Sequence, residues 1–144
     1  MRKGFTLIEM TIVLVIILAF LAMSVPFFAN FSSATGINTA TREISTLLRT
    51  TRSYAIAKNE NYDAVFDTTT TPNRFWIRDS ATTTMVGKGL SLPTGVTFNA
   101  PVTVTFTSTG GITGSADVTI TIGNAKGKTK TIKVYYVTGM VEIQ

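Results

Sequence analysis

One carboxylate, Glu9, stands inside an otherwise uncharged apolar segment near the N-terminus. It is the only charged residue from Phe5 to Ala29. An ionised group inside a hydrophobic span is costly and usually marks a function. The chemistry open to such a carboxylate is an ion pair with a cation, and the segment has no cationic side chain. The isolated carboxylate therefore indicates a cationic partner outside this segment.

The chain contains no histidine and no cysteine. The missing histidine excludes a His general base, a Ser-His-Asp triad and the usual zinc sites. The missing cysteine excludes a disulfide, although the expected compartment would permit one. Asp63, Asp67 and Asp79 are too scattered for a calcium loop. We therefore expect no catalytic residues, no metal site and no cofactor, and predict that the protein is not an enzyme.

A basic cluster near the C-terminus consists of Lys126, Lys128, Lys130 and Lys133. Lysines can contact the phosphates of DNA without reading its sequence. The alternative is a solvated hairpin loop. The first three lysines have even residue numbers, as do Ile132 and Val134, so in one continuous strand they would share the buried face of these residues. Three lysines cannot all lie on that buried face. We place these three in the turn at 123–127 and at the start of the next strand. The net charge of +5 is too small to argue for nucleic acid by itself.

A second set of side chains combines one tryptophan with two arginines. Arg74, Trp76 and Arg78 alternate with Phe75 and Ile77, so they share the opposite face of a predicted strand. A tryptophan between arginines can stack on bases or on a partner protein. The alternative is that it covers the domain surface or packs on a loop.

The N-terminal elements predict one long helix from Phe5 to about Asn59. Its uncharged stretch from Met10 to Ala29 has 20 residues, about 30 Å of helix, which matches a bilayer core. Arg2 and Lys3 favour a cytoplasmic N-terminus, with the remaining chain outside the cytoplasm. Pro26 removes a helical hydrogen bond and creates a weak point. A kink or fraying is expected at Asn30–Gly36.

The second half of this helix is predicted to be amphipathic. Apolar and small residues recur at steps of three and four, which defines one face that must pack on the rest of the chain. This face contains Ile37, Ala40, Ile44, Leu47, Leu48, Thr51 and Ala55.

After Lys58 the sequence becomes rich in threonine, valine, isoleucine and glycine. Alternating apolar residues predict six to eight short antiparallel strands. The fold class is therefore α+β, with a long N-terminal helix packed on a C-terminal antiparallel sheet or sandwich. The alternating sets are Tyr62/Ala64/Phe66, Phe75/Ile77, Val102/Val104/Phe106, Val118/Ile120/Ile122, Ile132/Val134/Tyr136 and Val141/Ile143.

The first nine residues, MRKGFTLIE, resemble the leader of type IV pilins and type II secretion pseudopilins. The resemblance implies that a prepilin peptidase cuts between Gly4 and Phe5, and that the new amine of Phe5 is methylated. Glu9 becomes the fifth residue of the mature chain, a position that this family reserves for glutamate. Pro26 matches a proline that many members have in the helix.

The resemblance also implies a role for Glu9, as the partner of the Phe5 amine on a neighbouring subunit. In a low-dielectric filament core that attraction is strong, and an unpaired carboxylate is penalised, so the pair would favour correct axial register. Pro26 would let the helix stretch or melt during assembly. The alternatives are a hydrated carboxylate near the membrane surface and an ordinary membrane-helix proline.

Two further segments resemble GspH/FimT-type minor pilins. The run from Leu47 to Asn59 is similar to the end of their helix, and Val137–Ile143 is similar to their C-terminal Gly-Arg-Val strand. Some FimT-like pilins serve DNA uptake and share a C-terminal Gly-Arg-x-Arg. This chain has Gly-Met-Val-Glu from Gly139 to Glu142, without either arginine.

These resemblances imply a minor pseudopilin, a structural subunit of the type II secretion pseudopilus. Its partners would be other pilin or pseudopilin subunits, prepilin peptidase and the inner membrane, where a single-pass anchor precedes filament assembly. The alternatives are a FimT-like type IV minor pilin in pilus assembly or DNA uptake, with DNA as a partner, and a major pilin. The expected regions are a leader at 1–4, a transmembrane helix at 5–29, an amphipathic helix at 30–59 and a β-rich domain at 60–144, in the periplasm or outside.

Overall fold

The structure is a computed structural model that describes the backbone of residues 4–144 and the side chains of residues 4–22 and 35–144. Contacts within the chain divide it into two units, Met1–Ala34 and Thr35–Gln144. The first unit consists of the N-terminal part of α1. The second unit contains the rest of α1 and every strand of the described chain.

Helix α1 covers Leu7–Lys58, close to the predicted bounds, and is continuous through 30–36, where the sequence predicts a kink or fraying. Asn59, directly after the last residue of the helix, has a φ of 56°. The Asn59 N–H donates to the Ile56 carbonyl over 3.4 Å, and the Glu60 N–H donates to the Ala55 carbonyl over 3.2 Å. This pair of bonds is a Schellman motif, in which asparagine takes the left-handed position usually held by glycine.

The described side chains of the first unit, residues 4–22, are all exposed. Most are large and apolar, from Phe5 with 74% exposure to Leu21 with 58%. A contiguous apolar surface of this kind marks a contact with another molecule.

Among the residues that the structure describes, no helix has the length and apolarity needed to span a membrane. The last part of the predicted span, residues 23–29, lies outside the described side chains, as does Pro26 within it.

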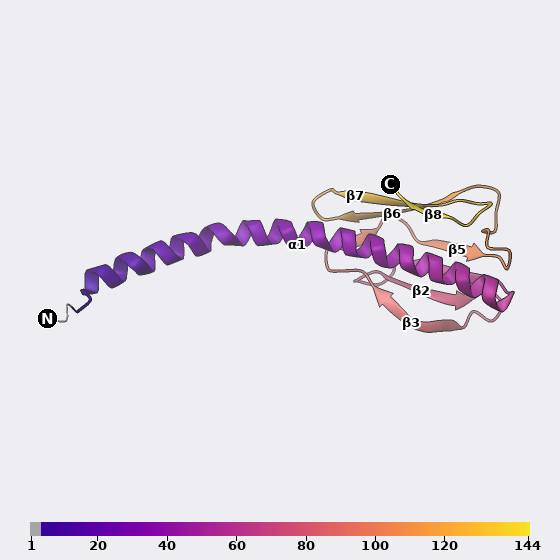
Figure 1. Ribbon diagram of the computed structural model, residues 1–144, viewed down its shortest axis with the longest axis horizontal. Helices are drawn as coiled ribbons and strands as arrows, with labels where there is room; N and C mark the ends of the chain where they lie inside the picture. The colour runs from indigo at the N-terminus through magenta and orange to yellow at the C-terminus, as the bar shows by residue number, and fades with distance from the viewer. Residues whose placement is uncertain (1–3) are drawn as a thin grey trace. The chain divides into compact units, whose positions relative to one another are not determined.

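Two four-stranded antiparallel sheets make up the rest of the second unit, and Figure 1 shows the C-terminal part of α1 running alongside their strands. The first sheet has the order β3-β2-β1-β5 and the second has the order β4-β6-β7-β8. The first sheet consists of β1 (Tyr62–Asp67), β2 (Arg74–Asp79), β3 (Met85–Ser91) and β5 (Val102–Phe106). The second sheet consists of β4 (Val96–Phe98), β6 (Val118–Asn124), β7 (Thr129–Val134) and β8 (Val141–Ile143).

The fold class expected from the sequence is confirmed. Every residue of the predicted helix face is buried, from Ile37 to Ala55, and its apolar members join one core with apolar residues of both sheets. Phe98 of the second sheet packs edge-on against Phe66 and Phe75 of the first, with ring centroids 5.3 and 6.1 Å away. Such pairs stabilise a core beyond the area they bury. The helix is therefore held by both sheets.

The sequence did not predict β3 and β4. β3 lies at the edge of its sheet, contains Gly87 and Gly89, and has no alternation of buried residues. β4 has three residues, too few for a period to be recognised. Both strands exist because a neighbouring strand pairs with them, which is a tertiary effect.

Candidate processing and assembly site

The predicted cleavage site lies at an exposed, non-helical start of the described chain. Gly4 and Phe5 precede α1, and the Phe5 side chain is 74% exposed. A Cβ added to Gly4 would meet no atom within 4 Å. The fold therefore does not require glycine at this position, and the segment is accessible to another protein.

Thr6 and Glu9 form a reciprocal capping box at the start of α1. The Glu9 N–H donates to Thr6 Oγ1 over 3.3 Å, and the Thr6 N–H donates to Glu9 Oε2 over 3.5 Å. This arrangement satisfies two backbone donors that a helix otherwise leaves unpaired. The sequence contains the signal for this capping box, as Thr-x-x-Glu before an apolar run.

The geometry gives the Glu9 carboxylate two compatible roles. It lies in the first turn of the helix, where the macrodipole favours a negative charge. The one hydrogen bond that it accepts within the described residues is long, at 3.5 Å, and a carboxylate can accept about four. Because Glu9 is exposed, the remaining positions are open to an amine supplied by another chain.

The structure separates the four lysines of the predicted basic cluster. Lys126 and Lys128 lie in the loop between β6 and β7, and Lys130 lies near the start of β7, as predicted. Lys133, in the middle of β7, instead binds Asp117 with 2.9 Å between Nζ and Oδ2. Its Nζ also lies 4.7 Å from the centre of the Tyr135 ring. The fourth lysine is therefore engaged in contacts within the domain.

The acidic partner of Lys133 is itself held in place by the backbone that follows β7. The Tyr136 N–H donates to Asp117 Oδ1 over 2.9 Å, and this bond, together with Lys133, keeps the pKa of Asp117 below its usual value. A lowered carboxyl pKa stabilises the fold at neutral pH, and this contribution is lost as the pH falls through the folded-state value. A phosphate would have to compete with this carboxylate for Lys133.

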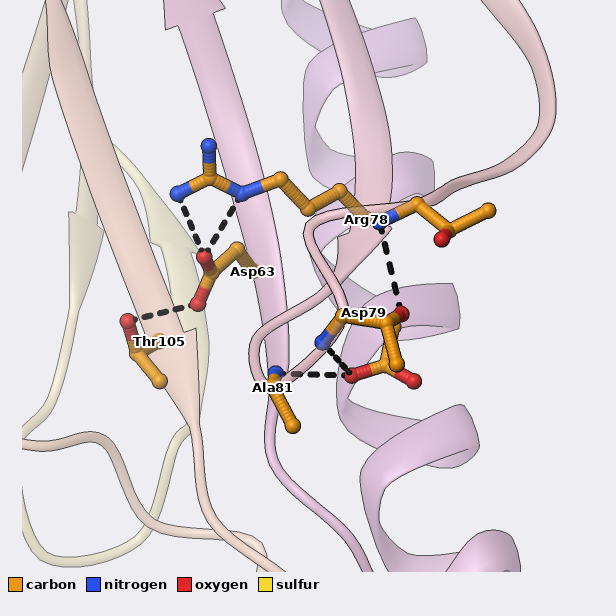
Figure 2. Close-up of polar contacts among 7 residues, drawn as sticks. Asp63, Arg78, Asp79, Ala81 and Thr105 are labelled. Carbon is orange, nitrogen blue, oxygen red and sulfur yellow. Dashed lines mark hydrogen bonds and ion pairs between the residues drawn. The ribbon is translucent and has the colours of Figure 1, made fainter.

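Arg74, Trp76 and Arg78 share one face of β2, as predicted, while Phe75 and Ile77 are buried on the other face. Figure 2 shows the Arg78 guanidinium reaching Asp63 of β1, with Nη2 and Nε donating to Asp63 Oδ2 over 2.7 and 2.9 Å. Asp63 Oδ1 accepts a further hydrogen bond of 2.8 Å from Thr105 Oγ1. Three bonds stabilise a carboxylate that is almost fully buried. This arginine is therefore occupied and does not offer a free charge.

The two segments that resemble GspH/FimT-type pilins meet at the carbonyl of Gly110. Arg52, near the end of α1, donates from Nε to the Gly110 carbonyl over 2.9 Å. Gly139, between β7 and β8, has a φ of 60°, and a Cβ there would stand 2.0 Å from the same carbonyl oxygen. No local pattern in the sequence indicates this contact, because it joins residues 58 positions apart.

Comparisons with known proteins agree with the description of the N-terminal segment and with that of the fold. Residues 1–25 match the family described as the prokaryotic N-terminal methylation motif. By sequence, no curated protein matches the chain. The motif occupies the segment in which Gly4, Phe5 and Glu9 were singled out.

The fold is similar to that of solved minor pilins and pseudopilins. The type IV minor pilin FimU of Pseudomonas aeruginosa strain PAO1 is 16% identical, with a TM-score of 0.63 over 79% of this chain and 92% of FimU. A second crystal form of FimU, also 16% identical, has a TM-score of 0.58 over 74% of this chain and 91% of FimU. The minor pseudopilin EpsH from the Type 2 Secretion System of Vibrio cholerae is 13% identical, with a TM-score of 0.59 over 76% of this chain and 96% of EpsH.

The N-terminal motif and the fold together support the pilin and pseudopilin superfamily, so the resemblance drawn from the leader is confirmed. Within that superfamily, the similar structures are a minor pilin and a minor pseudopilin. The two resemble this chain to a comparable degree, with TM-scores of 0.63 and 0.59.

Proposed function

We propose that this chain is a minor pseudopilin, a structural subunit of a type II secretion pseudopilus. The observation that carries the proposal is the start of α1. There, an exposed Gly4–Phe5 bond precedes α1, Glu9 lies in the first turn of the helix, and the described apolar side chains up to residue 22 are all exposed. An apolar helix with one carboxylate in its first turn is suited to packing against copies of itself or close relatives.

In the proposed mechanism the protein catalyses no reaction. A prepilin peptidase cuts between Gly4 and Phe5, and the Phe5 amine is methylated. Before assembly, the apolar helix is held in the inner membrane, with the β domain in the periplasm or outside. During assembly the helix packs against neighbouring helices, and Glu9 pairs with the Phe5 amine of another subunit. Pro26 would serve as a weak point in the helix.

The proposal is tested by the mass of the mature chain. Because Gly4 lies in open space, Gly4→Ala leaves the fold intact, and we expect it to prevent cleavage and leave a full-length precursor in membranes. The wild-type chain should begin at Phe5 and carry one added methyl group. Intact-mass spectrometry of both proteins measures the difference.

The matched control for this experiment is Gly36→Ala, a glycine within α1 whose added Cβ meets neighbours only at an ordinary 3.7 Å. This variant should be processed like the wild type. A Gly4→Ala chain that begins at Phe5, or a wild-type chain that begins at Met1, would contradict the proposal.

The type IV minor pilin is the second candidate, because FimU has a similar fold. Deleting the chain separates the two systems. For a pseudopilin, we expect secreted proteins to be retained in the cell while surface pili are unchanged. Loss of pili with normal secretion would instead favour the type IV system, including pilus assembly or DNA uptake. The pairing of Lys133 with Asp117 disfavours the DNA alternative.

A further inference from the structure

The outer face of the first sheet carries a row of three paired side chains. Val65 of β1 stands opposite Trp76 of β2 on one side and opposite Thr103 of β5 on the other. Directly opposed residues on antiparallel strands have side chains in contact range. This row, Trp76/Val65/Thr103, faces away from the core, which takes Phe66 and Phe75 from the same strands.

The two rows of side chains that flank Trp76/Val65/Thr103 on the same face of the sheet each combine opposite charges. On one side Arg78 binds Asp63, which also accepts from Thr105 (Figure 2). On the other side Arg74 is paired in register with Asp67. The pKa of Asp67 is lowered mainly by hydrogen bonds from Thr69, with a smaller effect of Arg74. The two arginines are thus balanced by two aspartates, and the face has no excess of positive charge for phosphates.

A shallow cavity of about 240 Å³ opens beside the row. Trp76, Val65 and Pro101 provide apolar lining, and Asp67 and Thr103 provide polar lining. Its volume is below the roughly 300–1,000 Å³ of sites for drug-sized ligands. The cavity is therefore suited to a single ring.

Several hydrogen-bonding groups around this cavity are available. Within the described residues, neither the Trp76 indole N–H nor the Thr103 hydroxyl has a hydrogen-bond partner. Every buried side-chain donor of these residues does have a partner, so the indole N–H and the hydroxyl are both open to solvent. The Asp67 carboxylate accepts two bonds from Thr69 and retains acceptor capacity. Donors and acceptors therefore surround an aromatic surface.

We propose that this site binds one ring of a neutral saccharide. The apolar C–H face of a sugar ring stacks on the indole, and its hydroxyls bond to Asp67, Thr103 and the indole N–H. A nucleic acid would stack on the same ring but would find its phosphates facing a surface without net positive charge. An aliphatic peptide side chain would leave the polar groups unused. The site adds a binding activity to the proposed role as a filament subunit.

Tryptophan fluorescence of the chain comes from this site alone, because Trp76 is its only tryptophan. Intrinsic fluorescence of the full-length chain, kept in a detergent without a sugar headgroup, is titrated with chitotriose, cellotriose, maltotriose and oligothymidylate. We expect a saturable change with at least one trisaccharide, which persists at about 0.5 M salt, where phosphate contacts weaken. Thr103→Val should weaken that binding roughly fivefold, as expected for one lost hydrogen bond.

The matched control is Thr119→Val, an exposed threonine of β6 in the other sheet. It should bind the trisaccharide like the wild type. The proposal is overturned by a flat titration with all three saccharides up to about 50 mM, or by a response to oligothymidylate alone that salt removes. Equal weakening in both threonine variants would also overturn it.

Discussion

Replacing Glu9 by glutamine should leave the chain folded, anchored and cleaved, yet prevent its incorporation into filaments. Glutamine can take the reciprocal place in a capping box with Thr6, so the start of α1 is preserved. The variant loses only the negative charge. In the proposed filament, the Phe5 amine of a neighbour would then be buried without a counter-ion.

The expected effect is large because the pair would lie in an apolar core. Removing one partner of a buried ion pair costs about 3–5 kcal/mol, which corresponds to more than about a hundredfold in association. The measurement is the amount of the variant in sheared filaments, relative to the amount of processed variant in membranes. A mass spectrum of the membrane fraction establishes that cleavage still occurs.

Two further variants separate charge from capping. Glu9→Asp keeps the charge but shortens the side chain, so it should retain part of the incorporation. Thr6→Val removes the capping hydroxyl and leaves the carboxylate, at a cost of about 1 kcal/mol to the helix start, and should assemble nearly normally. If Glu9→Gln assembles as well as the wild type while Thr6→Val does not, capping is the function of Glu9 and the pairing proposal is wrong.

The second large effect is expected at Gly139, where alanine should destabilise the β domain severely. Gly139 has a φ of 60°, and its Cβ would stand 2.0 Å from the Gly110 carbonyl oxygen. The backbone of Gly110 would have to move, although Arg52 holds the same oxygen with a 2.9 Å hydrogen bond. The variant therefore combines an unfavourable conformation with displacement of the contact between α1 and the loops.

We expect a loss of at least about 3 kcal/mol in the free energy of unfolding. For a domain of this size this is a decrease of roughly 10 °C or more in Tm. Thermal unfolding followed by circular dichroism measures it. Arg52→Ala should produce a smaller decrease of about 1 kcal/mol, since only one hydrogen bond is lost.

Gly127→Ala is the matched control for the backbone conformation. Gly127 has a φ of 76°, but its Cβ would meet nothing within 4 Å. It should cost only the conformational strain, about 1–2 kcal/mol. If Gly139→Ala is no more destabilising than Gly127→Ala, the contact with Gly110 does not hold the end of α1 in place.

The sequence determined the features that depend on local spacing. The anomalous Glu9, the Gly4–Phe5 bond and the apolar run are all contiguous, and the motif match covers the same segment. The helix face from Ile37 to Ala55 follows from a period of 3.6 residues, and the alternating strands follow from a period of two. Periodicity predicts these elements well because it reports which side of an element leaves water.

Tertiary structure decided the contacts that no local pattern encodes. The pairing of edge strand β3 with β2 depends on a neighbouring strand rather than on the β3 sequence. The binding of Asp63 by Arg78 depends on register between two strands, and that of Lys133 by Asp117 on the antiparallel return of the chain. The contact of Arg52 with Gly110 beside Gly139 joins three distant segments. A side chain's partner is chosen in space, after the chain has folded, whereas its face on a helix or strand is set by its neighbours in sequence.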